Sequence, residues 1–349
     1  MKSVLICRCV CKHWNTLISD PNFAKILFTY TPTSTLIRHS ESTTFHLLEY
    51  DLIQWHESRS NKPFCCGVYN ALKPNHSRSR KITKLDPKFK VPLPHPESVM
   101  IIGSTRVYFN AMNSCNGLLY LWPSTSRYKD TSLICNPITG EFIRLPKAPP
   151  ITKPCRTICS AFGFHQKTNQ YKVMRIQIIK HSLDHHDDGM IVEMHIVGTS
   201  TWINIEVDYP KNLTFLSFYS TYLNGALHWI GMDAHDNASM WSFNFDTERF
   251  QSFSLPEMFE NRTKFSLFEF RGSLCVMYYN ENLVRMWMME KYGIGESWAR
   301  ILHSSAPLFD FTFEAIRHVP SLISLKDVII GDNVEVLSIY SMDERDQGF

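Results

Sequence analysis

Two long segments of this chain resemble each other, and this internal repetition constrains the fold more than any other feature of the sequence. Residues 116–122 (NGLLYLW) are similar to residues 224–230 (NGALHWI). A threonine in a turn-like segment follows 22 residues after the glycine in both cases, at Thr139 and at Thr247. Self-similarity at a fixed period is typical of architectures in which one structural unit is repeated.

The spacing of a second pair of similar segments indicates the size of one unit. Trp202 and Trp298 end these segments and lie 96 residues apart, which is twice 48. Units of about 40 to 50 residues with four short strands are typical of β-propeller blades, which stack radially because one blade cannot cover its own apolar faces. Residues 35–349 would hold about 6.6 such units. The chain is therefore predicted to be mainly β and propeller-like, with six blades favoured and seven as the alternative.

Strand-like runs occur throughout this region. Residues 171–176, 193–197 and 225–230 are rich in β-branched and aromatic side chains and are separated by turn residues. We also predict that a strand near residues 44–50 completes the last blade together with residues 339–345. Most of the tryptophans in strand-like segments are expected to pack between blades, and a subset on one exposed face would mark a target-binding patch: Trp122, Trp202, Trp229, Trp241, Trp287 and Trp298.

The first 34 residues show a different period. Apolar side chains at Ile6, Val10, Trp14 and Leu17 follow the spacing of one helical face. The Asp20-Pro21 pair ends this pattern, because proline disfavours helical geometry at the residue before it, and a second short apolar turn follows at residues 23–28. We therefore divide the chain into a helical part, residues 1–34, and a propeller-like part, residues 35–349.

Charge and hydropathy exclude several classes of protein. The formal charge of +3 over 349 residues gives no concentrated basic surface for nucleic acid or an anionic membrane. No apolar run reaches the length of a membrane span, and Arg8 interrupts the N-terminus too early for a signal peptide. The ten irregularly spaced cysteines are expected to be reduced thiols. We expect a soluble protein of the cytoplasm, the nucleus or both.

Three segments invite a functional interpretation, and a structural one is preferred for each. The CxCxC run at residues 7–11 spreads its thiols around a helix, and the His- and Asp-rich residues 181–189 have the composition of a hairpin loop. The basic window at residues 73–90 is expected to be an exposed loop, with docking of an acidic partner as the alternative. Neither a nucleophile elbow nor a phosphate-binding glycine loop occurs. We predict no catalytic residue, no metal site and no cofactor.

A family resemblance rests on seven segments that occur in order along the chain. Residues 2–24 resemble the second half of an F-box, as found in the large plant family of F-box proteins. The other six segments resemble the F-box-associated domain of that family: residues 114–119, 135–146, 161–173, 224–230, 272–277 and 287–298. Such an ordered series is far more specific than any single motif.

The resemblance implies a substrate-recognition adaptor of an SCF-type cullin-RING ubiquitin ligase. In such a subunit the F-box docks on the Skp-type linker protein, and the propeller selects an unknown target protein. The residues that match the family's linker-docking face are Leu5, Val10, Trp14, Leu17, Ile18, Pro21 and Phe23. The alternative for these side chains is internal packing of the helical part, since apolar helix positions serve both roles.

One departure from the family concerns the start of the F-box, which normally opens with a Leu-Pro-containing helix upstream of the position of Lys2. Because a short helical unit without this helix buries little area, we expect linker binding by this chain to be weak or absent. The alternative function is a stand-alone propeller scaffold for protein interactions, without a link to ubiquitin. An enzyme would need convergent carboxylates or histidines in a deep channel.

Overall fold

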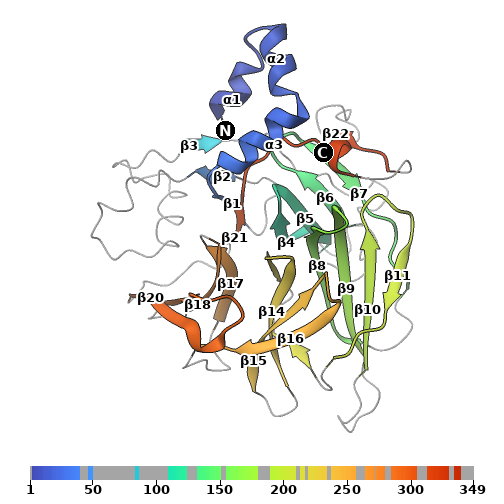
Figure 1. Ribbon diagram of the computed structural model, residues 1–349, viewed down its shortest axis with the longest axis vertical. Coiled ribbons are helices and arrows are strands. Elements are labelled where there is room, and N and C mark those ends of the chain that lie inside the picture. The colour runs from blue at the N-terminus through green and yellow to red at the C-terminus, as the bar shows by residue number, and fades with distance from the viewer. Residues whose placement is uncertain are drawn as a thin grey trace, which may run out of the picture.

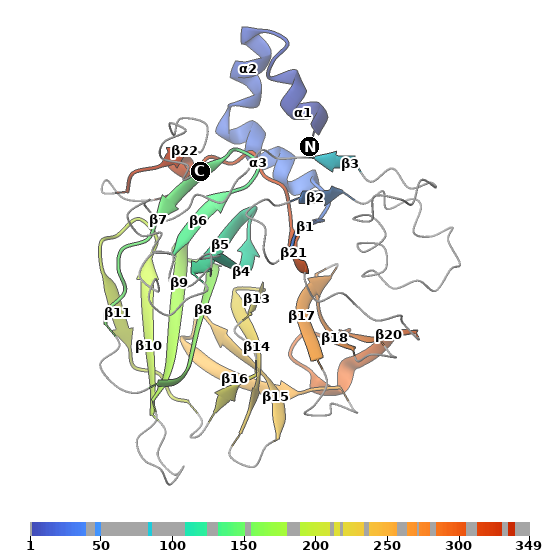
Figure 2. The same ribbon diagram turned by 180° about the vertical axis from the view of Figure 1, so that it is seen from behind.

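The computed structural model places all of the described strands in five antiparallel sheets around one axis (Figure 1). It describes residues 2–39, 46–49, 83–85, 109–123, 132–150, 155–179, 189–209, 213–216, 219–233, 237–256, 264–270, 272–279, 284–304, 313–329 and 334–338. Three helices lie at one end of the molecule, in the two opposite views of Figures 1 and 2. The arrangement confirms the mainly β, propeller-like fold with an N-terminal helical part.

The sheets are numbered here in order of their first strand. Sheet 1 consists of β21 (Phe313–His318), β1 (Ser34–His39), β2 (His46–Glu49) and β3 (Thr83–Leu85). Sheet 2 consists of β4 (Phe109–Cys115), β5 (Leu118–Pro123), β6 (Leu133–Asn136), β7 (Glu141–Arg144) and β22 (Leu337–Ser338). Sheet 3 consists of β8 (Cys155–His165), β9 (Gln170–Ile179), β10 (Gly189–Ile196) and β11 (Trp202–Ile205).

The last two sheets follow the same plan. Sheet 4 consists of β12 (Thr214–Phe215), β13 (Thr221–Leu223), β14 (Ala226–Met232), β15 (Ala238–Asn244) and β16 (Arg249–Ser254). Sheet 5 consists of β17 (Lys264–Phe270), β18 (Ser273–Tyr279), β19 (Val284–Met289) and β20 (Trp298–Ser304), with a short 3-10 turn, Gly295–Ser297, before its last strand. A one-turn helix, α6 (Leu325–Val328), lies between β21 and β22.

The predicted count of six blades, with seven as the alternative, differs from the five sheets that the described residues form. Dividing the chain by 48 assumed an even distribution of residues among the blades. Sheet 1 departs from this, because residues 50–82 separate β2 from β3, and its fourth strand comes from the other end of the chain. The uneven spacing of this one sheet explains why the division overestimated the number.

The repeats themselves mark equivalent positions in alternate sheets. Asn116-Gly117 turns β4 into β5 and Asn224-Gly225 turns β13 into β14, with positive φ at all four residues. Positive φ at both central residues is the type I′ hairpin turn for which Asn-Gly is the preferred pair. Trp202 and Trp298 both begin the fourth strand of their sheets, β11 and β20. Each repeat therefore spans two sheets, as the halved interval predicted.

The ring is closed by strands from opposite ends of the chain. β1 pairs with β21 over six residues, from Ser34 opposite His318 to His39 opposite Phe313. Residues 46–49 of the predicted closing strand form β2 and lie in this same sheet. Its predicted partner, residues 339–345, lies outside the described residues, and β22 just before it pairs with β7 in sheet 2. In the described residues β1 and β21 thus close the ring, and the joining of residues 44–50 with residues 339–345 stays a prediction.

The helical period of the first residues does not produce one straight helix. α1 (Lys2–Cys7) ends at a turn, Cys11 is extended, and α2 (Lys12–Ile18) begins anew. Val4 and Cys7 of α1 and Ile18 of α2 contact one core cluster. In a straight helix Val4 and Ile18 would lie about 21 Å apart along the helix axis. The break between α1 and α2 therefore allows both side chains to reach the same core cluster.

Pro21 was predicted to end the helical pattern, but it begins the helix α3 (Pro21–Tyr30). The Asp20 carboxylate accepts hydrogen bonds from the amides of Asn22, at 2.7 Å, and Phe23, at 3.3 Å. Asp is a preferred N-cap, and proline is favoured at the first helical position because its missing N–H needs no partner there. The Asp20-Pro21 pair therefore begins a helix that is longer than the predicted turn at residues 23–28.

The helices share a hydrophobic core with the propeller. Ile18 and Ala24 lie in one buried cluster with residues of sheets 1 and 2, among them Leu36 and Leu119. Half-buried side chains of α3, including Phe23, pack against this cluster. The predicted boundary between residues 34 and 35 falls at the start of β1, but the helical part has no core separate from the propeller.

The six tryptophans of the strand-like segments pack where they were predicted. Trp229 is fully buried and the other five are half-buried, each within or against one of three hydrophobic clusters. All three clusters contain side chains of neighbouring sheets, such as Phe162 of β8 with Tyr120 of β5. None of the six supplies an exposed aromatic patch.

Sheets 3 and 4 approach each other closely at Gly163. A Cβ atom at this position would lie 2.5 Å from Cε2 of Phe245 and 2.8 Å from Cδ2 of Tyr222. We expect Gly163→Ala to lower the free energy of unfolding by about 1 to 3 kcal/mol, the usual cost of overpacking. Urea denaturation measures this loss, and it should shrink in a Phe245→Leu background. An undiminished loss in that background would contradict the steric explanation.

Candidate functional site

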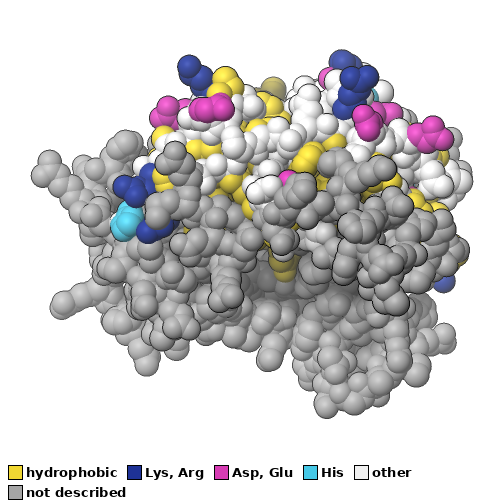
Figure 3. Space-filling view, turned by 90° about the horizontal axis from the view of Figure 1, so that it is seen from below, with side chains coloured by type: hydrophobic (Ala, Val, Ile, Leu, Met, Phe, Trp, Pro, Cys, Tyr) yellow, Lys and Arg dark blue, Asp and Glu magenta, His cyan; other side chains and the backbone are white. Residues whose placement is uncertain are grey.

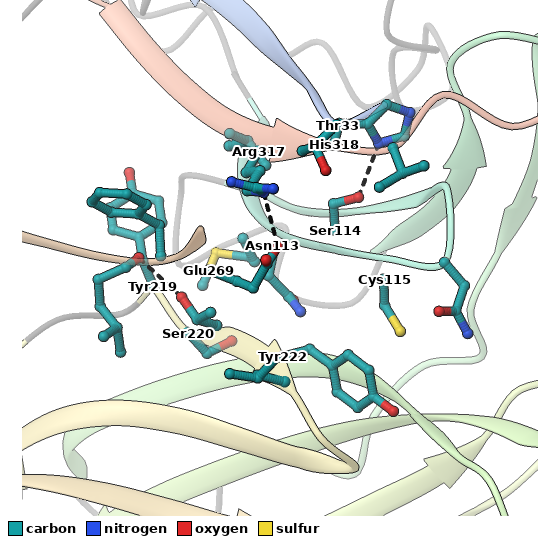
Figure 4. A pocket seen from close by; sticks show the side chains of 18 of the residues that line it. Thr33, Asn113, Ser114, Cys115, Tyr219, Ser220, Tyr222, Glu269, Arg317 and His318 are labelled. Atoms are coloured by element: carbon teal, nitrogen blue, oxygen red, sulfur yellow. Dashed lines mark hydrogen bonds and ion pairs between the residues drawn. The ribbon is translucent and has the colours of Figure 1, made fainter. Parts of the chain in front are cut away.

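A cavity of about 490 Å³ lies at the centre of the ring (Figure 4). It is lined by residues of β4, β13, β17 and β21, so four of the five sheets contribute to it. Phe28 of α3 and Thr33, just before β1, line it as well. The cavity therefore adjoins the helical part as well as the propeller.

An ion pair joins sheet 5 to sheet 1 across this cavity. Nε of Arg317, on β21, lies 2.8 Å from Oε2 of Glu269, on β17, and both side chains are about four-fifths buried. Figure 4 shows the two side chains reaching toward each other from their strands. The Arg317 guanidinium also lies 5.4 Å from the centre of the Phe270 ring, within range of a cation–π interaction.

A hydroxyl–imidazole pair joins sheet 1 to sheet 2. Oγ of Ser114, on β4, lies 2.9 Å from Nδ1 of His318, on β21. Burial lowers the pKa of His318 to about 3, so its imidazole is neutral at physiological pH. Nε2 of His318 has no hydrogen-bond partner among the described residues. A base this weak, with no group to orient it, is poorly suited to activate the serine as a nucleophile.

The remaining neighbouring sheets are linked by side chain to backbone hydrogen bonds. The Asn113 amide, on β4, donates to O of Phe162 at 2.5 Å and accepts from N of Phe162 at 3.1 Å, which links sheets 2 and 3. The Tyr222 hydroxyl donates to O of Phe164 at 2.6 Å, and the Thr221 hydroxyl donates to O of Leu267 at 2.9 Å. Polar contacts thus connect every pair of adjacent sheets around the cavity.

Two further polar groups of the cavity wall, besides those that link the sheets, are buried. The Ser220 hydroxyl has no hydrogen-bond partner among the described residues, although the side chain is buried. The Cys115 thiol is also buried, and desolvation raises its pKa well above the ordinary value, so it stays protonated. A protonated, buried thiol is inert, whereas a buried hydroxyl without a partner keeps an unmet hydrogen-bonding capacity.

A second candidate surface lies on the helical part, where the predicted linker-docking residues divide into two groups. Val10, Trp14 and Leu17 are 66%, 46% and 51% exposed, and Pro21 is exposed too. Trp14 and Leu17, three residues apart, share one face of α2. In contrast, Ile18 is buried and Phe23 packs against the shared core. Leu5 lies in α1, and its side chain is outside the described part of the structure.

The other segments that invited a functional interpretation carry no site in the described residues. Cys9 and Cys11 are exposed free thiols, Cys7 is half-buried, and no described group of three or more His, Cys, Asp or Glu could hold a metal ion. Residues 181–188 and most of the basic window at 73–90 lie outside the described residues. No described helix is long and apolar enough to cross a membrane.

The end of the molecule opposite the helices has a mixed surface. Figure 3 shows that its described residues carry charged groups of both signs, with hydrophobic side chains between them. Among the described residues of this face neither sign of charge dominates, in agreement with the nearly balanced composition.

The cavity residues were not among the predicted site residues. Ser114 and Tyr222 stand two positions before the Asn-Gly turns, so the repeats could have placed them on innermost strands. Glu269 and Arg317 belong to segments without a clear repeat partner, and no signal in one sequence indicates that they meet. The repeats therefore locate part of the cavity wall, whereas the sequence does not indicate the ion pair.

The fold and the ring of inner strands define a propeller protein that presents surfaces for binding. A family model described as the F-box associated beta propeller domain matches residues 61–326, about three quarters of the chain. The chain therefore belongs to the F-box-associated β-propeller family.

Relatives from Arabidopsis thaliana agree with this assignment. F-box protein At3g07870 is 29% identical over 211 residues, covering 55% of this chain and 50% of the relative. F-box protein At1g47340 is 24% identical over 277 residues, covering 78% and 51%. F-box/kelch-repeat protein At3g23880 is 22% identical over 320 residues, covering 89% and 77%. The alignment thus spans about half the length of the first two relatives.

The similarity of this chain to solved structures is distant. TolB from Acinetobacter baumannii is similar over 86% of this chain and 71% of that protein, with a TM-score of 0.29 and 10% sequence identity.

Proposed function

We propose that this chain is a substrate-recognition adaptor of an SCF-type cullin-RING ubiquitin ligase. The observation that carries the proposal is an exposed apolar surface, formed by Val10, Trp14 and Leu17, at positions that match the family's F-box. Large exposed apolar groups on an otherwise packed helical unit are typical of an interaction site. The relatives named as F-box proteins support the same function.

In this function the two ends of the molecule have different partners. The helical part binds the Skp-type linker, and the propeller binds a target protein. The adaptor needs no catalytic group, because it raises the effective concentration of the target near a ubiquitin-charged enzyme. The neutral, poorly basic His318 beside Ser114 is consistent with a binding role. We place this function in the cytoplasm, the nucleus or both.

The docking face is tested by measuring the affinity of a recombinant Skp-type linker for the chain by calorimetry. We expect weak, saturable binding, with Kd on the order of 10 μM. The double variant Trp14→Asp and Leu17→Asp should weaken it at least tenfold, because it places charges on the apolar face. The matched control is Ile203→Asp, which adds a charge at an exposed apolar residue of β11, away from the helices.

Two results would contradict the proposal. One is no detectable binding of the linker by the folded chain, which would leave the stand-alone propeller scaffold as the better interpretation. The other is equal affinity of the double variant and the unaltered chain. Circular dichroism of each variant establishes that the fold is retained, which is expected since both replaced side chains are about half exposed.

A further inference from the structure

The central cavity has the dimensions of a small-molecule site. Its volume of about 490 Å³ lies within the range of ligand pockets, roughly 300 to 1,000 Å³. Binding of a linker to α2 makes no use of this cavity, so a ligand here would act independently of the proposed function.

The charges of the wall favour an uncharged ligand. Arg317 and Glu269 are the only charged side chains among the described lining residues, and they are paired with each other at 2.8 Å. A charged ligand would either break this pair or remain unpaired beside it, and both are costly. A neutral ligand can use the pair intact, since a hydroxyl group can donate to the carboxylate and accept from the guanidinium.

The neutral groups of the wall favour a ligand with many hydroxyl groups. Hydroxyl side chains come from three of the sheets, at Ser114, Ser220, Thr221 and Ser266. Among these, the buried Ser220 hydroxyl has no hydrogen-bond partner in the described residues. Hydroxyl groups both donate and accept, and therefore match a ligand of the same kind in several orientations.

Aromatic side chains supply the apolar part of the same wall. Phe28, Tyr219, Phe265 and Phe268 line the cavity, and Tyr219 is partly exposed. Aromatic faces combined with a few convergent polar groups are typical of ligand pockets. A saturated ring presents C–H groups on its faces and hydroxyl groups at its edge, which fits a wall of this composition.

We propose that the central cavity binds a neutral, polyhydroxylated ring compound, of the size of a mono- or disaccharide or a cyclitol. The Ser220 hydroxyl and the Arg317–Glu269 pair hold its hydroxyl groups, and the aromatic side chains pack against its C–H faces. Phe28 and Thr33 bring the bound ligand into contact with the helical part.

The experiment titrates the full chain with D-glucose, N-acetyl-D-glucosamine, myo-inositol and sucrose, observed by saturation-transfer NMR and calorimetry. We expect at least one of these probes to bind with Kd below about 1 mM. D-glucuronate and D-glucosamine are the charged counterparts, and they should bind at least tenfold more weakly than the best neutral probe. Sugars and cyclitols are both neutral, polyhydroxylated ring compounds, and the separate titrations with sugars and with myo-inositol distinguish them.

Variants assign the binding to the cavity. Ser220→Leu fills the space beside the hydroxyl and should weaken binding at least tenfold, while Ser220→Ala removes only one hydrogen bond and should weaken it about fivefold. The matched control is Ser252→Leu, at an exposed serine of β16 in the same sheet, which should leave affinity unchanged. If Ser220→Leu does not fold, Ser220→Ala carries the test.

Three outcomes would overturn the proposal. The first is no binding of any neutral probe at 10 mM to the folded chain. The second is equal binding by the charged counterparts. The third is undiminished binding by the folded Ser220 variants, which would place the site elsewhere. None of these outcomes bears on the linker-docking face, so the two proposals fail separately.

Discussion

Replacing Asn136 by alanine is expected to lower the free energy of unfolding by about 3 to 5 kcal/mol. The Asn136 amide is fully buried and donates to O of Ser321, at 3.0 Å, and O of Ile323, at 2.8 Å. Its carbonyl accepts from N of Ile138 and N of Thr139. Alanine leaves these four backbone groups without their partner and removes two of the hydrogen bonds that join the segment after β21 to sheet 2. Denaturation in guanidinium chloride measures the loss.

The repeats provide a matched control for this experiment. Asn244 occupies the equivalent position two sheets later, and its carbonyl accepts from N of Asp246 and N of Thr247 in the same way. These bonds are exposed and stay within one turn, so Asn244→Ala should cost only about 1 kcal/mol. Asn136→Asp separates the two roles, because it keeps the acceptor and removes the donor. Equal losses at Asn136 and Asn244 would contradict this account of the turn.

A second large effect is expected in sheet 3. Nε of Arg175 lies 2.5 Å from Oε2 of Glu193, and both side chains are almost completely buried. Gln177 donates to the same carboxylate oxygen at 2.7 Å. Glu193→Leu leaves the Arg175 guanidinium buried without its counter-charge, which should lower the free energy of unfolding by about 3 to 5 kcal/mol. Thermal and chemical denaturation both detect a change of this size.

A double-mutant cycle shows whether the unpaired charge causes this loss. Arg175→Met combined with Glu193→Leu removes both charges, and we expect most of the stability to return, because apolar side chains of similar volume replace buried pairs at little cost. The control is Lys167→Met, which removes an exposed ion pair with Asp246 and should cost less than about 1 kcal/mol. Additive losses in the cycle would show that the two side chains act independently.

The architecture could be predicted because neighbouring residues in the sequence determine its turns. Asn116-Gly117 and Asn224-Gly225 have the backbone geometry that this residue pair prefers, and each turn joins the same two strands of its sheet. Trp202 and Trp298 likewise begin equivalent strands. The repeating unit and the mainly β fold follow from these positions without knowledge of any long-range contact.

The remaining features depend on contacts between distant residues. The helical period of residues 6–17 gives no sign of the break at Cys11, which follows from packing of Val4 and Ile18 on one core. The number of sheets depends on which segments pair, and β1 meets a strand almost 280 residues away. The same is true of the cavity, where the Arg317–Glu269 pair joins strands of different sheets.

The shared core of the helices and sheets 1 and 2 has a mechanical consequence. No flexible tether separates α3 from β1, since only residues 31–33 lie between them. A protein held on the propeller would therefore be presented to a ligase at one orientation. Under the proposed function, the position of a lysine on the surface of the bound target would decide whether that lysine is modified. Lengthening the connection at residues 31–33 should increase the number of lysines that are modified.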